Sequence, residues 1–358
     1  MRPAQARINL QALQHNFTRV RALAPDSKVM AIIKANAYGH GLVTVAHALG
    51  AADAFGVACM EEAIALREAG FDRPVVLLEG LFGEDDLALI HGYQLDVVIH
   101  HASQLEILEQ NRLAQPLNVW LKIDTGMHRL GFAPEQVAAV CRRLEKLPQL
   151  GTLRYMTHFA CADEAENPAT PLQLECFRET CADFSGERSL ANSAAVLAWP
   201  ESHADWVRPG IMLYGSSPLS ASTAEELDLQ PVMTLATRLI AVNPRSKGDA
   251  VGYGGDWICP EDMPVGVAAL GYGDGYPRHA PAGMPLLVNG QRCALIGRVS
   301  MDMICIDLRT QPDAQVGDEV ILWGEGLAVD EVAQQAGTIA YELLCGVSSR
   351  VRFSYHID

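Results

Sequence analysis

The stretch KVMAIIK, residues 28–34, shows the pattern on which the fold prediction rests. It is a short β-rich run, and the alternation of side chains along a strand places Met30, Ile32 and Lys34 on one face. Seven similar runs follow, separated by stretches of helical texture rich in Ala, Leu and Glu. The eight runs cover residues 28–34, 54–58, 74–79, 96–100, 118–124, 153–159, 188–193 and 206–215.

Strands that alternate with helices predict βαβ units and a parallel sheet, and eight of them predict a closed (β/α)₈ barrel. A doubly wound open sheet is the alternative, but no G-x-G-x-x-G motif follows the first strand. From Gln230 onward, short strands are punctuated by Gly and Pro, which indicates a mainly β domain. We therefore expect an α/β, TIM-like barrel in residues 1–230 and a mainly β domain in residues 231–358.

The composition excludes several classes of function. The 358 residues carry a net charge of −16, which disfavours binding to nucleic acid or to an anionic membrane. The nine cysteines include no C-x-x-C pair, so we expect reduced thiols and no structural metal. The sequence shows neither a signal peptide nor an apolar stretch long enough for a transmembrane helix. A cytoplasmic protein is expected.

Functional groups of a barrel belong at the carboxyl ends of its strands. In residues 118–124, NVWLKID, the alternation turns Trp120, Lys122 and Asp124 into the barrel. An inward lysine is costly unless it is paired or chemically altered. Lys34 ends the first strand and His158 lies at the end of the sixth, so both are expected at the same mouth.

A buried lysine with a lowered pKa suits Schiff-base chemistry, because only the neutral amine attacks a carbonyl. Phosphate sites of barrels usually follow strands 7 and 8, where Ser193 and residues 208–211 lie. Ser193 is also expected to cap a helix that starts at Ala194. A Schiff-base lysine beside a phosphate site suggests pyridoxal 5′-phosphate (PLP). A class I aldolase acting on a sugar phosphate fits equally well, so the chemistry alone leaves two candidates.

The stretch AIIKANAYGHG, residues 31–41, resembles the PLP-lysine signature of alanine racemases. Further segments match the family in the same order, and the resemblance extends from residue 7 to about residue 355. They are WLKIDTGMHR at 120–129, THF at 157–159, DWVRPGI at 205–211, VGYG at 251–254, GYGDGYPR at 271–278 and GRVSMDM at 297–303.

The resemblance implies a PLP-dependent racemase that interconverts L-alanine and D-alanine, for peptidoglycan synthesis or for alanine catabolism. It also implies a homodimer whose active sites are shared between the subunits. Lys34 would carry PLP as an aldimine and act as one base. Tyr253 of the other subunit would be the opposing base, supported by His158, and Arg208 would bond the pyridine nitrogen.

The resemblance also implies a set of binding residues. Arg129 would contact the phenolic oxygen of PLP and the substrate carboxylate, and a carbamylated Lys122 would position it. Met301 would take part in carboxylate binding, and Tyr272 would line the substrate entrance. The residues implied to hold the phosphate are Tyr38, Ser193, Gly210, Ile211 and Tyr341.

Several alternatives remain at this point. A broad-spectrum or serine racemase of the same fold would differ in the residues that line the entrance. A PLP amino-acid decarboxylase is normally longer, and a non-catalytic PLP-binding protein would lack the second domain. Taken without its context, Lys122 is also compatible with an ion pair to Asp124, and His40 is expected to be a surface or loop residue.

Overall fold

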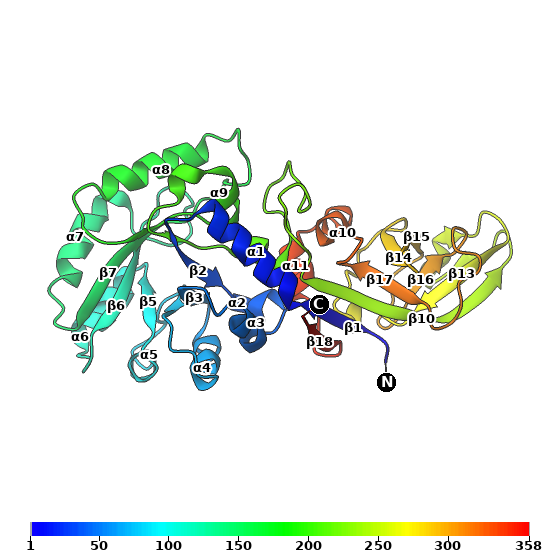
Figure 1. The fold of residues 1–358 in the computed structure, drawn as a ribbon, viewed down its shortest axis with the longest axis horizontal. Coiled ribbons are helices and arrows are strands. Elements are labelled where there is room, and N and C mark those ends of the chain that lie inside the picture. The colour runs from blue at the N-terminus through cyan, green and yellow to red at the C-terminus, as the bar shows by residue number, and fades with distance from the viewer. Residues whose placement is uncertain (1, 358) are drawn as a thin grey trace.

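A closed barrel of eight parallel strands forms one half of the molecule (Figure 1). The computed structural model describes residues 2–357. Strand β2 pairs in parallel with β9, with Lys28 opposite Trp206, and this pairing closes the ring. The fold-class prediction is confirmed. In ring order the strands are β2 (Lys28–Ile32), β3 (Ala54–Val57), β4 (Val75–Leu77), β5 (Asp96–Ile99), β6 (Leu117–Lys122), β7 (Leu150–Met156), β8 (Arg188–Ser189) and β9 (Trp206–Val207).

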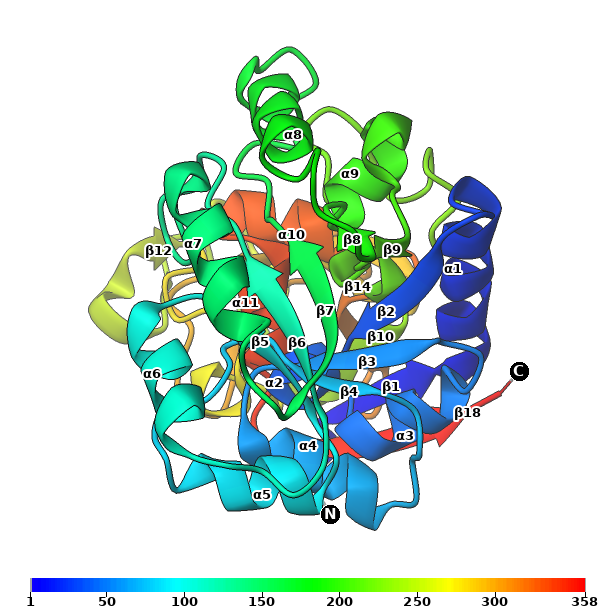
Figure 2. The ribbon, with the colours of Figure 1, turned by 90° about the vertical axis from the view of Figure 1, so that its left-hand side faces the viewer.

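Helices cover the outside of the barrel (Figure 2). Helix α7 illustrates why, because it starts with Pro134 and buries Val137, Val140 and Leu144, which recur every three or four residues. The helices that follow the strands or precede the barrel are α1 (Leu10–Leu23), α3 (Leu42–Ala48), α4 (Met60–Glu68), α5 (Asp86–Gly92), α6 (Ala102–Gln110), α7 (Pro134–Leu144), α8 (Ala169–Thr180) and α9 (Ser193–Ala198).

The second half is a mainly β domain, as predicted. Its long strand β10 pairs with β17 along its first part and with β13 along its last part, so the sheet curls back on itself. The strands are β10 (Met233–Arg245), β13 (Met263–Ala268), β14 (Pro285–Val288), β15 (Gln291–Ile296), β16 (Ile304–Asp307), β17 (Glu319–Trp323) and β18 (Arg352–His356), with a small pair β11 (Ala250–Val251) and β12 (Trp257–Ile258) and helices α10 (Val329–Ala336) and α11 (Ala340–Cys345).

The first strand of the chain was not predicted from the sequence. Strand β1 (Gln5–Asn9) lies in the sheet of the β domain, antiparallel to β10 and parallel to β18. The Asn9 side chain then accepts a hydrogen bond from the Ala12 N–H at 2.9 Å and caps α1. The chain thus passes from the β sheet directly into the first helix of the barrel.

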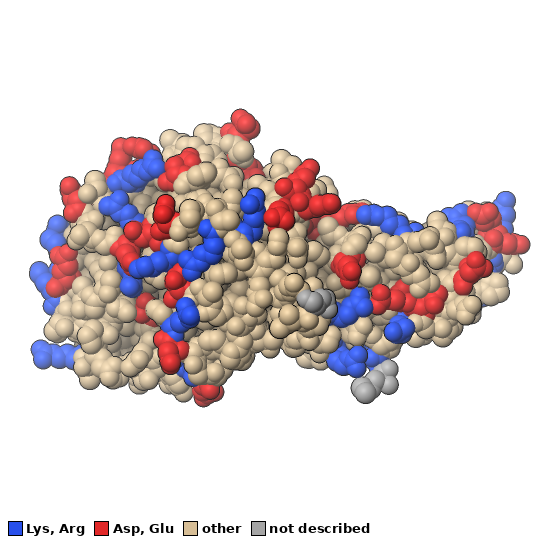
Figure 3. Space-filling model, viewed as in Figure 1, with Lys and Arg blue, Asp and Glu red and all other residues tan. Residues whose placement is uncertain are grey.

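The surface charge and the lengths of the helices can be compared with the expectation that the chain binds neither nucleic acid nor a membrane. On the face drawn in Figure 3, Lys and Arg lie among Asp and Glu and form no continuous basic surface. No helix within residues 2–357 is long and apolar enough to cross a bilayer. Over the same residues, no group of three or more His, Cys, Asp or Glu side chains could hold a metal ion.

The interior of the barrel confirms the predicted alternation of side chains. Trp120 of β6 contacts Trp206 of β9 edge to face at 5.7 Å, and these strands are not neighbours in the ring. The Arg154 guanidinium lies 5.2 Å from the Trp120 ring centroid. Arg154 also bonds Glu187 at 2.7 Å, and Glu187 accepts further hydrogen bonds from Lys28 and from the indole N–H of Trp206.

This network is expected to make the fold sensitive to acid. Burial raises the pKa of Glu187, but hydrogen bonds from Lys28, Trp206 and Arg154 outweigh it and lower the pKa from 4.5 to about 2. The carboxylate therefore stabilises the fold above about pH 4.5, and its contribution is lost as the pH falls towards 2. Glu187→Gln should lower the melting temperature by a few degrees at neutral pH.

Calorimetry at several pH values between roughly 3 and 7 tests this prediction. The difference between the wild type and Glu187→Gln should shrink towards the acid end. Glu109→Gln is the control, because Glu109 forms a more exposed pair with Arg143 on the helical surface. A difference for Glu187→Gln that does not change with pH would contradict the argument.

Candidate active site

One cavity of about 1380 Å³ opens at the carboxyl ends of the barrel strands, where they meet α10 and α11. The sequence predicted a site at this mouth, and most of the residues named for it line the cavity. Those residues are Lys34, Tyr38, Lys122, Arg129, His158, Ser193, Arg208, Gly210, Ile211 and Tyr341.

Four cations that influence one another, Lys34, Lys122, Arg129 and Arg208, line this cavity, which acidic residues such as Asp163 and Asp330 also line. Burial, and after it the charges of Arg208, Arg129 and Lys34, together lower the pKa of Lys122 to about 8. Asp124 favours the charged form of Lys122, but its carboxylate accepts the N–H groups of residues 126 and 128 and pairs with His128. The ion pairs within residues 2–357 include none of these four cations. The cavity is therefore suited to an anionic ligand.

Arg208 is buried and bonds only neutral groups. It donates to the Ser189 hydroxyl at 2.7 Å and to the carbonyls of Thr157 and Leu190 at 2.6 and 3.2 Å. Burial lowers the pKa of Arg208 to about 10, which still leaves the guanidinium charged at neutral pH. Its charge is thus held in the site without a neutralising carboxylate.

His158 is neutral, and its tautomer follows from its neighbour. Burial lowers the pKa of His158 well below its ordinary value, and the cation Arg208 acts in the same direction. The guanidinium lies 3.3 Å from Nδ1 of His158 and can only donate, so Nδ1 accepts. The proton of the neutral ring therefore sits on Nε2.

A cradle for an anion lies beside the cations. The Ser193 hydroxyl oxygen accepts the N–H groups of Gly210 and Met212 at 2.8 and 3.4 Å. Tyr38 lies against Gly210 so closely that a Cβ at residue 210 would come within 2.4 Å of the Tyr38 hydroxyl oxygen. Tyr341 of α11 completes the group, with its ring 5.9 Å from that of Tyr38. The hydroxyls of Ser193, Tyr38 and Tyr341 face a backbone that has no side chain at residue 210, which leaves room for a phosphate.

The predicted N-cap at Ser193 is wrong by one residue. Asn192 caps α9, and its side chain accepts the Ala195 N–H at 3.0 Å. Ser193 is the first residue of the helix. Its hydroxyl bonds the loop after β9, so the adjacent Asn takes the role of cap.

Lys34 is followed by a backbone conformation that the sequence analysis did not predict. Ala35, Asn36, Ala37 and Tyr38 have φ values of 54°, 53°, 55° and 51° and form a left-handed turn. Each such residue costs about 1–2 kcal/mol, so the turn concentrates strain between Lys34 and Tyr38. The cavity therefore includes a segment that surrounding contacts must hold in place.

His40 and Glu62 both contact the turn, and neither contact was predicted from the sequence. His40 was expected at the surface or in a loop; it does lie in the loop that follows the turn, but it is fully buried. Glu62 was not singled out, and its carboxylate accepts the backbone N–H groups of Asn36 at 2.9 Å and Ala58 at 3.1 Å. The sequence motif at residues 34–41 is too short to show a periodic pattern, so it does not indicate which of its side chains are buried.

Three predicted residues lie outside the cavity. Tyr253, Tyr272 and Met301 belong to loops of the β domain and are 69%, 38% and 53% exposed. The loops of Tyr272 and Met301 are joined, because the Tyr272 N–H donates to Ser300 O at 3.1 Å and the Gly273 N–H donates to Met301 O at 2.9 Å. A single chain thus brings together the amine, the cations and the cradle, but not these three side chains.

Known proteins match nearly the whole length of the chain. Family models for the N-terminal and C-terminal domains of alanine racemase match residues 8–218 and 232–355. The alanine racemase of Nitrosococcus oceani is 56% identical, with 97% of this chain and 98% of that protein covered. The crystal structure of the biosynthetic alanine racemase from Pseudomonas aeruginosa is 49% identical, covers 99% of this chain and 100% of its own, and superposes with a TM-score of 0.97.

A barrel with this mouth, followed by this β domain, defines an amino-acid racemase, which is a class of isomerase. The chain belongs to the alanine racemase family. The names of its relatives do not favour the alternative of a broad-spectrum or serine racemase.

The geometry at residue 210 predicts a specific defect. In Gly210→Ala the added methyl group would meet the Tyr38 hydroxyl at 2.4 Å, so the side chain or the loop must shift. We expect the dissociation constant for inorganic phosphate to rise about tenfold or more, with little change in melting temperature. Titration of the cofactor-free protein measures it. Gly83→Ala is the control, since a methyl group there meets nothing within 4 Å, and equal affinities for both variants would contradict the prediction.

Proposed function

We propose that two bases on opposite faces of the substrate Cα, Lys34 of one chain and Tyr253 of a second, carry out the alanine racemisation that family membership assigns to this protein. Racemisation removes a proton from one face of Cα and returns one to the other face. A single base tends to return the proton to the face from which it came, so two bases are the simplest solution. The observation that carries the proposal is the common cavity of Lys34, Arg208 and the Ser193–Gly210 cradle.

PLP is the proposed cofactor, and when bound it supplies a group that stabilises the negative charge left on Cα after proton removal. Lys34 would hold it covalently, and Arg208 would face its ring nitrogen. Because an arginine does not give up its proton, that nitrogen would stay unprotonated, which disfavours side reactions such as transamination. The phosphate would be held by the cradle, which consists of Tyr38, Ser193, Gly210, Ile211 and Tyr341.

Arg129 is proposed to bind the carboxylate of alanine. The loop that carries it is anchored, because the Asp124 N–H donates to Phe132 O and the Phe132 N–H donates to Lys122 O, both at 2.9 Å. The Asp124 carboxylate fixes the loop from inside by accepting two of its N–H groups. This anchoring presents the guanidinium at the mouth of the barrel, close to Lys122.

A second copy of the chain is proposed to complete each site. Tyr253 is exposed and does not line the cavity of its own chain, so it is available to another barrel. Tyr272 and Met301 would accompany it as entrance and carboxylate-binding residues. The Nε2–H of His158 could then donate a hydrogen bond to the incoming tyrosine oxygen and so position Tyr253. We propose a homodimer on this basis.

The remaining features of the proposal concern the chain as a whole. The division is a barrel unit, residues 1–230, and a β unit, residues 231–358, with β1 of the first unit inserted into the sheet of the second. A cytoplasmic location is proposed from the sequence. The D-alanine would serve peptidoglycan synthesis, or the enzyme would take part in alanine catabolism.

Mixed dimers test the shared site. One chain carries Lys34→Ala and the other carries Tyr253→Phe, and two affinity tags select dimers that contain both. If each site combines Lys34 of one chain with Tyr253 of the other, one site per mixed dimer has both bases and racemises alanine. Each parent dimer should be strongly impaired. Mixed dimers no more active than the parents would contradict the shared site.

Lys122 is predicted to take up carbon dioxide. Its pKa of about 8 leaves a neutral amine fraction near neutral pH, and this fraction grows as the pH rises. The amine attacks CO₂, a proton is released, and the anionic carbamate formed can pair with the cations around it. In buffer with ¹³C-labelled bicarbonate, a carbamate carbon signal should strengthen as the pH is raised from about 6 to about 8. Lys122→Arg should lack the signal, and its persistence in that variant would exclude Lys122 as the modified residue.

A further inference from the structure

The left-handed turn at residues 35–38 is the most strained backbone segment of the site. Within residues 2–357 the other non-glycine residues with positive φ occur singly, at Gln94, His128, Asp228 and Asn289. Two ends of the proposed cofactor site lie at the two ends of this turn, with Lys34 before it and the Tyr38 side chain at its close. The turn therefore fixes how far the Lys34 amine lies from the Tyr38 hydroxyl.

The outer side of the turn is held by Glu62 and Asn36. The Glu62 carboxylate accepts the Asn36 N–H at 2.9 Å, and the Asn36 side-chain oxygen accepts the Leu42 N–H at 2.9 Å. These bonds tie the start of the turn to α4 and to α3. On the inner side the backbone already contributes, because the Ala37 carbonyl accepts the backbone N–H of His40 at 3.0 Å, whereas the Tyr38 carbonyl is bonded by a side chain.

His40 satisfies the inner side. Its Nδ1 lies 3.0 Å from Ala37 O and 2.9 Å from Tyr38 O, the carbonyls of the last two residues of the turn. Carbonyl oxygens only accept, so Nδ1 carries the proton and donates to both. Burial lowers the pKa of His40 to about 4, so the ring is neutral and Nε2 is unprotonated. Nε2 is buried without a partner among the described residues, which leaves hydrogen bonding of this ring to Nδ1 alone.

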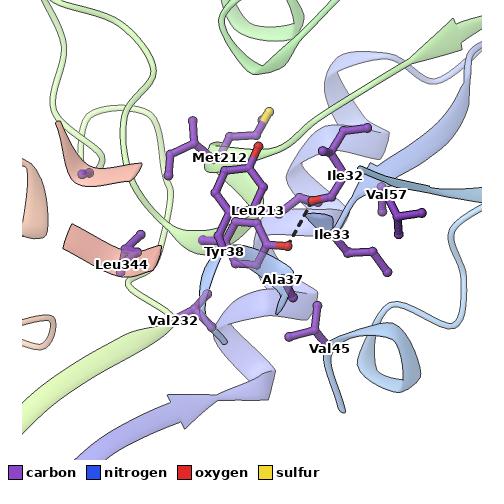
Figure 4. Packing of buried hydrophobic residues seen from close by; sticks show 14 of the residues in the cluster. Ile32, Ile33, Ala37, Tyr38, Val45, Val57, Met212, Leu213, Val232 and Leu344 are labelled. Carbon is purple, nitrogen blue, oxygen red and sulfur yellow. Dashed lines mark hydrogen bonds between the residues drawn. The ribbon is translucent and has the colours of Figure 1, made fainter. Parts of the chain in front are cut away.

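The His40 ring also supports Tyr38 through Tyr214. The His40 and Tyr214 rings lie 4.6 Å apart, and the Tyr214 and Tyr38 rings stack at 4.6 Å. The Tyr214 hydroxyl donates to Ile32 O at 3.0 Å, at the end of the strand that leads to Lys34. Figure 4 shows Tyr38 and Ile32 in a region of buried apolar side chains that includes Ala37 and Leu213.

We propose that His40 is a positioning residue: its Nδ1–H holds the inner carbonyls of the turn and thereby sets the span between the Lys34 amine and the Tyr38 hydroxyl. This inference rests on the proposed function, because the span matters when one rigid ligand must reach both groups. PLP is such a ligand, with an aldehyde for the amine and a phosphate for the cradle. Inorganic phosphate and pyridoxal each engage one end only, so they do not require the correct span.

Binding by the cofactor-free protein tests the proposal. The variants are His40→Phe, which keeps a ring and loses the donor, His40→Asn, whose amide nitrogen can take the place of Nδ1, and His40→Gln, whose amide lies nearer the position of Nε2. Dissociation constants are measured for PLP, pyridoxal and inorganic phosphate. Covalent attachment of PLP to Lys34 is trapped with borohydride, and circular dichroism follows folding.

For His40→Phe we expect the dissociation constant for PLP to rise about tenfold or more. Those for pyridoxal and inorganic phosphate should change less than about threefold. His40→Asn should bind PLP within about threefold of the wild type, and His40→Gln should resemble His40→Phe. Where His40→Phe fails to fold, the comparison of Asn with Gln decides.

Several results would overturn the proposal. One is that His40→Phe binds PLP with wild-type affinity. Another is that His40→Phe loses affinity equally for PLP, pyridoxal and inorganic phosphate, which indicates general disruption of the site. A third is identical behaviour of the Asn and Gln variants. If the wild type itself binds PLP without attachment to Lys34, the proposed function fails and the role of His40 fails with it. If the wild type attaches PLP normally and the variants match it, only the role of His40 is refuted.

Discussion

The pairing of β2 with β9 is the interaction on which the rest of the site depends. Its ladder continues past the strands, because the Ile32 N–H donates to Pro209 O at 3.0 Å. This bond brings the chain just before Lys34 beside residues 208–211, which are more than 170 positions away in sequence. Barrel closure therefore assembles amine, guanidinium and anion cradle in a single step. A sheet left open at this seam would leave the same side chains on opposite edges.

The site contains buried charges and strained backbone, both of which raise the free energy of the folded protein. Lys122 and Arg208 are buried or half-buried, yet neither has a carboxylate partner, and the backbone after Lys34 is left-handed. Each feature destabilises the protein alone and becomes favourable once an anionic ligand with a matching shape is present. The charged network around Glu187 at the other end of the barrel has the opposite character, since every cation there has a carboxylate partner. One end of the barrel stabilises the fold and the other is free for chemistry.

The sequence predicted the barrel well, because inward and outward positions differ in polarity along strands such as β6. Charged residues such as the one at the end of β6 also mark where a strand stops. The sequence did not predict β1 or β18, because those strands lie near one edge of a sheet formed by residues far apart in the chain. The left-handed turn was also missed, since the residues Ala35 to Ala37 carry no local signal for positive φ. Tyr253, Tyr272 and Met301 were found by resemblance alone, and one chain gives no geometry that relates them to the cavity.

The position of β1 has a consequence for the order of synthesis. The strand is made before its partners in the sheet, β10 and β18, which follow more than 220 and 340 residues later. The strands β2 to β9 are complete before either partner exists, so the barrel is free to close while β1 waits unpaired. The β sheet can then form only around the start of the chain. The two halves are therefore joined through β1 only after β10 and β18 have been made, later than every strand of the barrel.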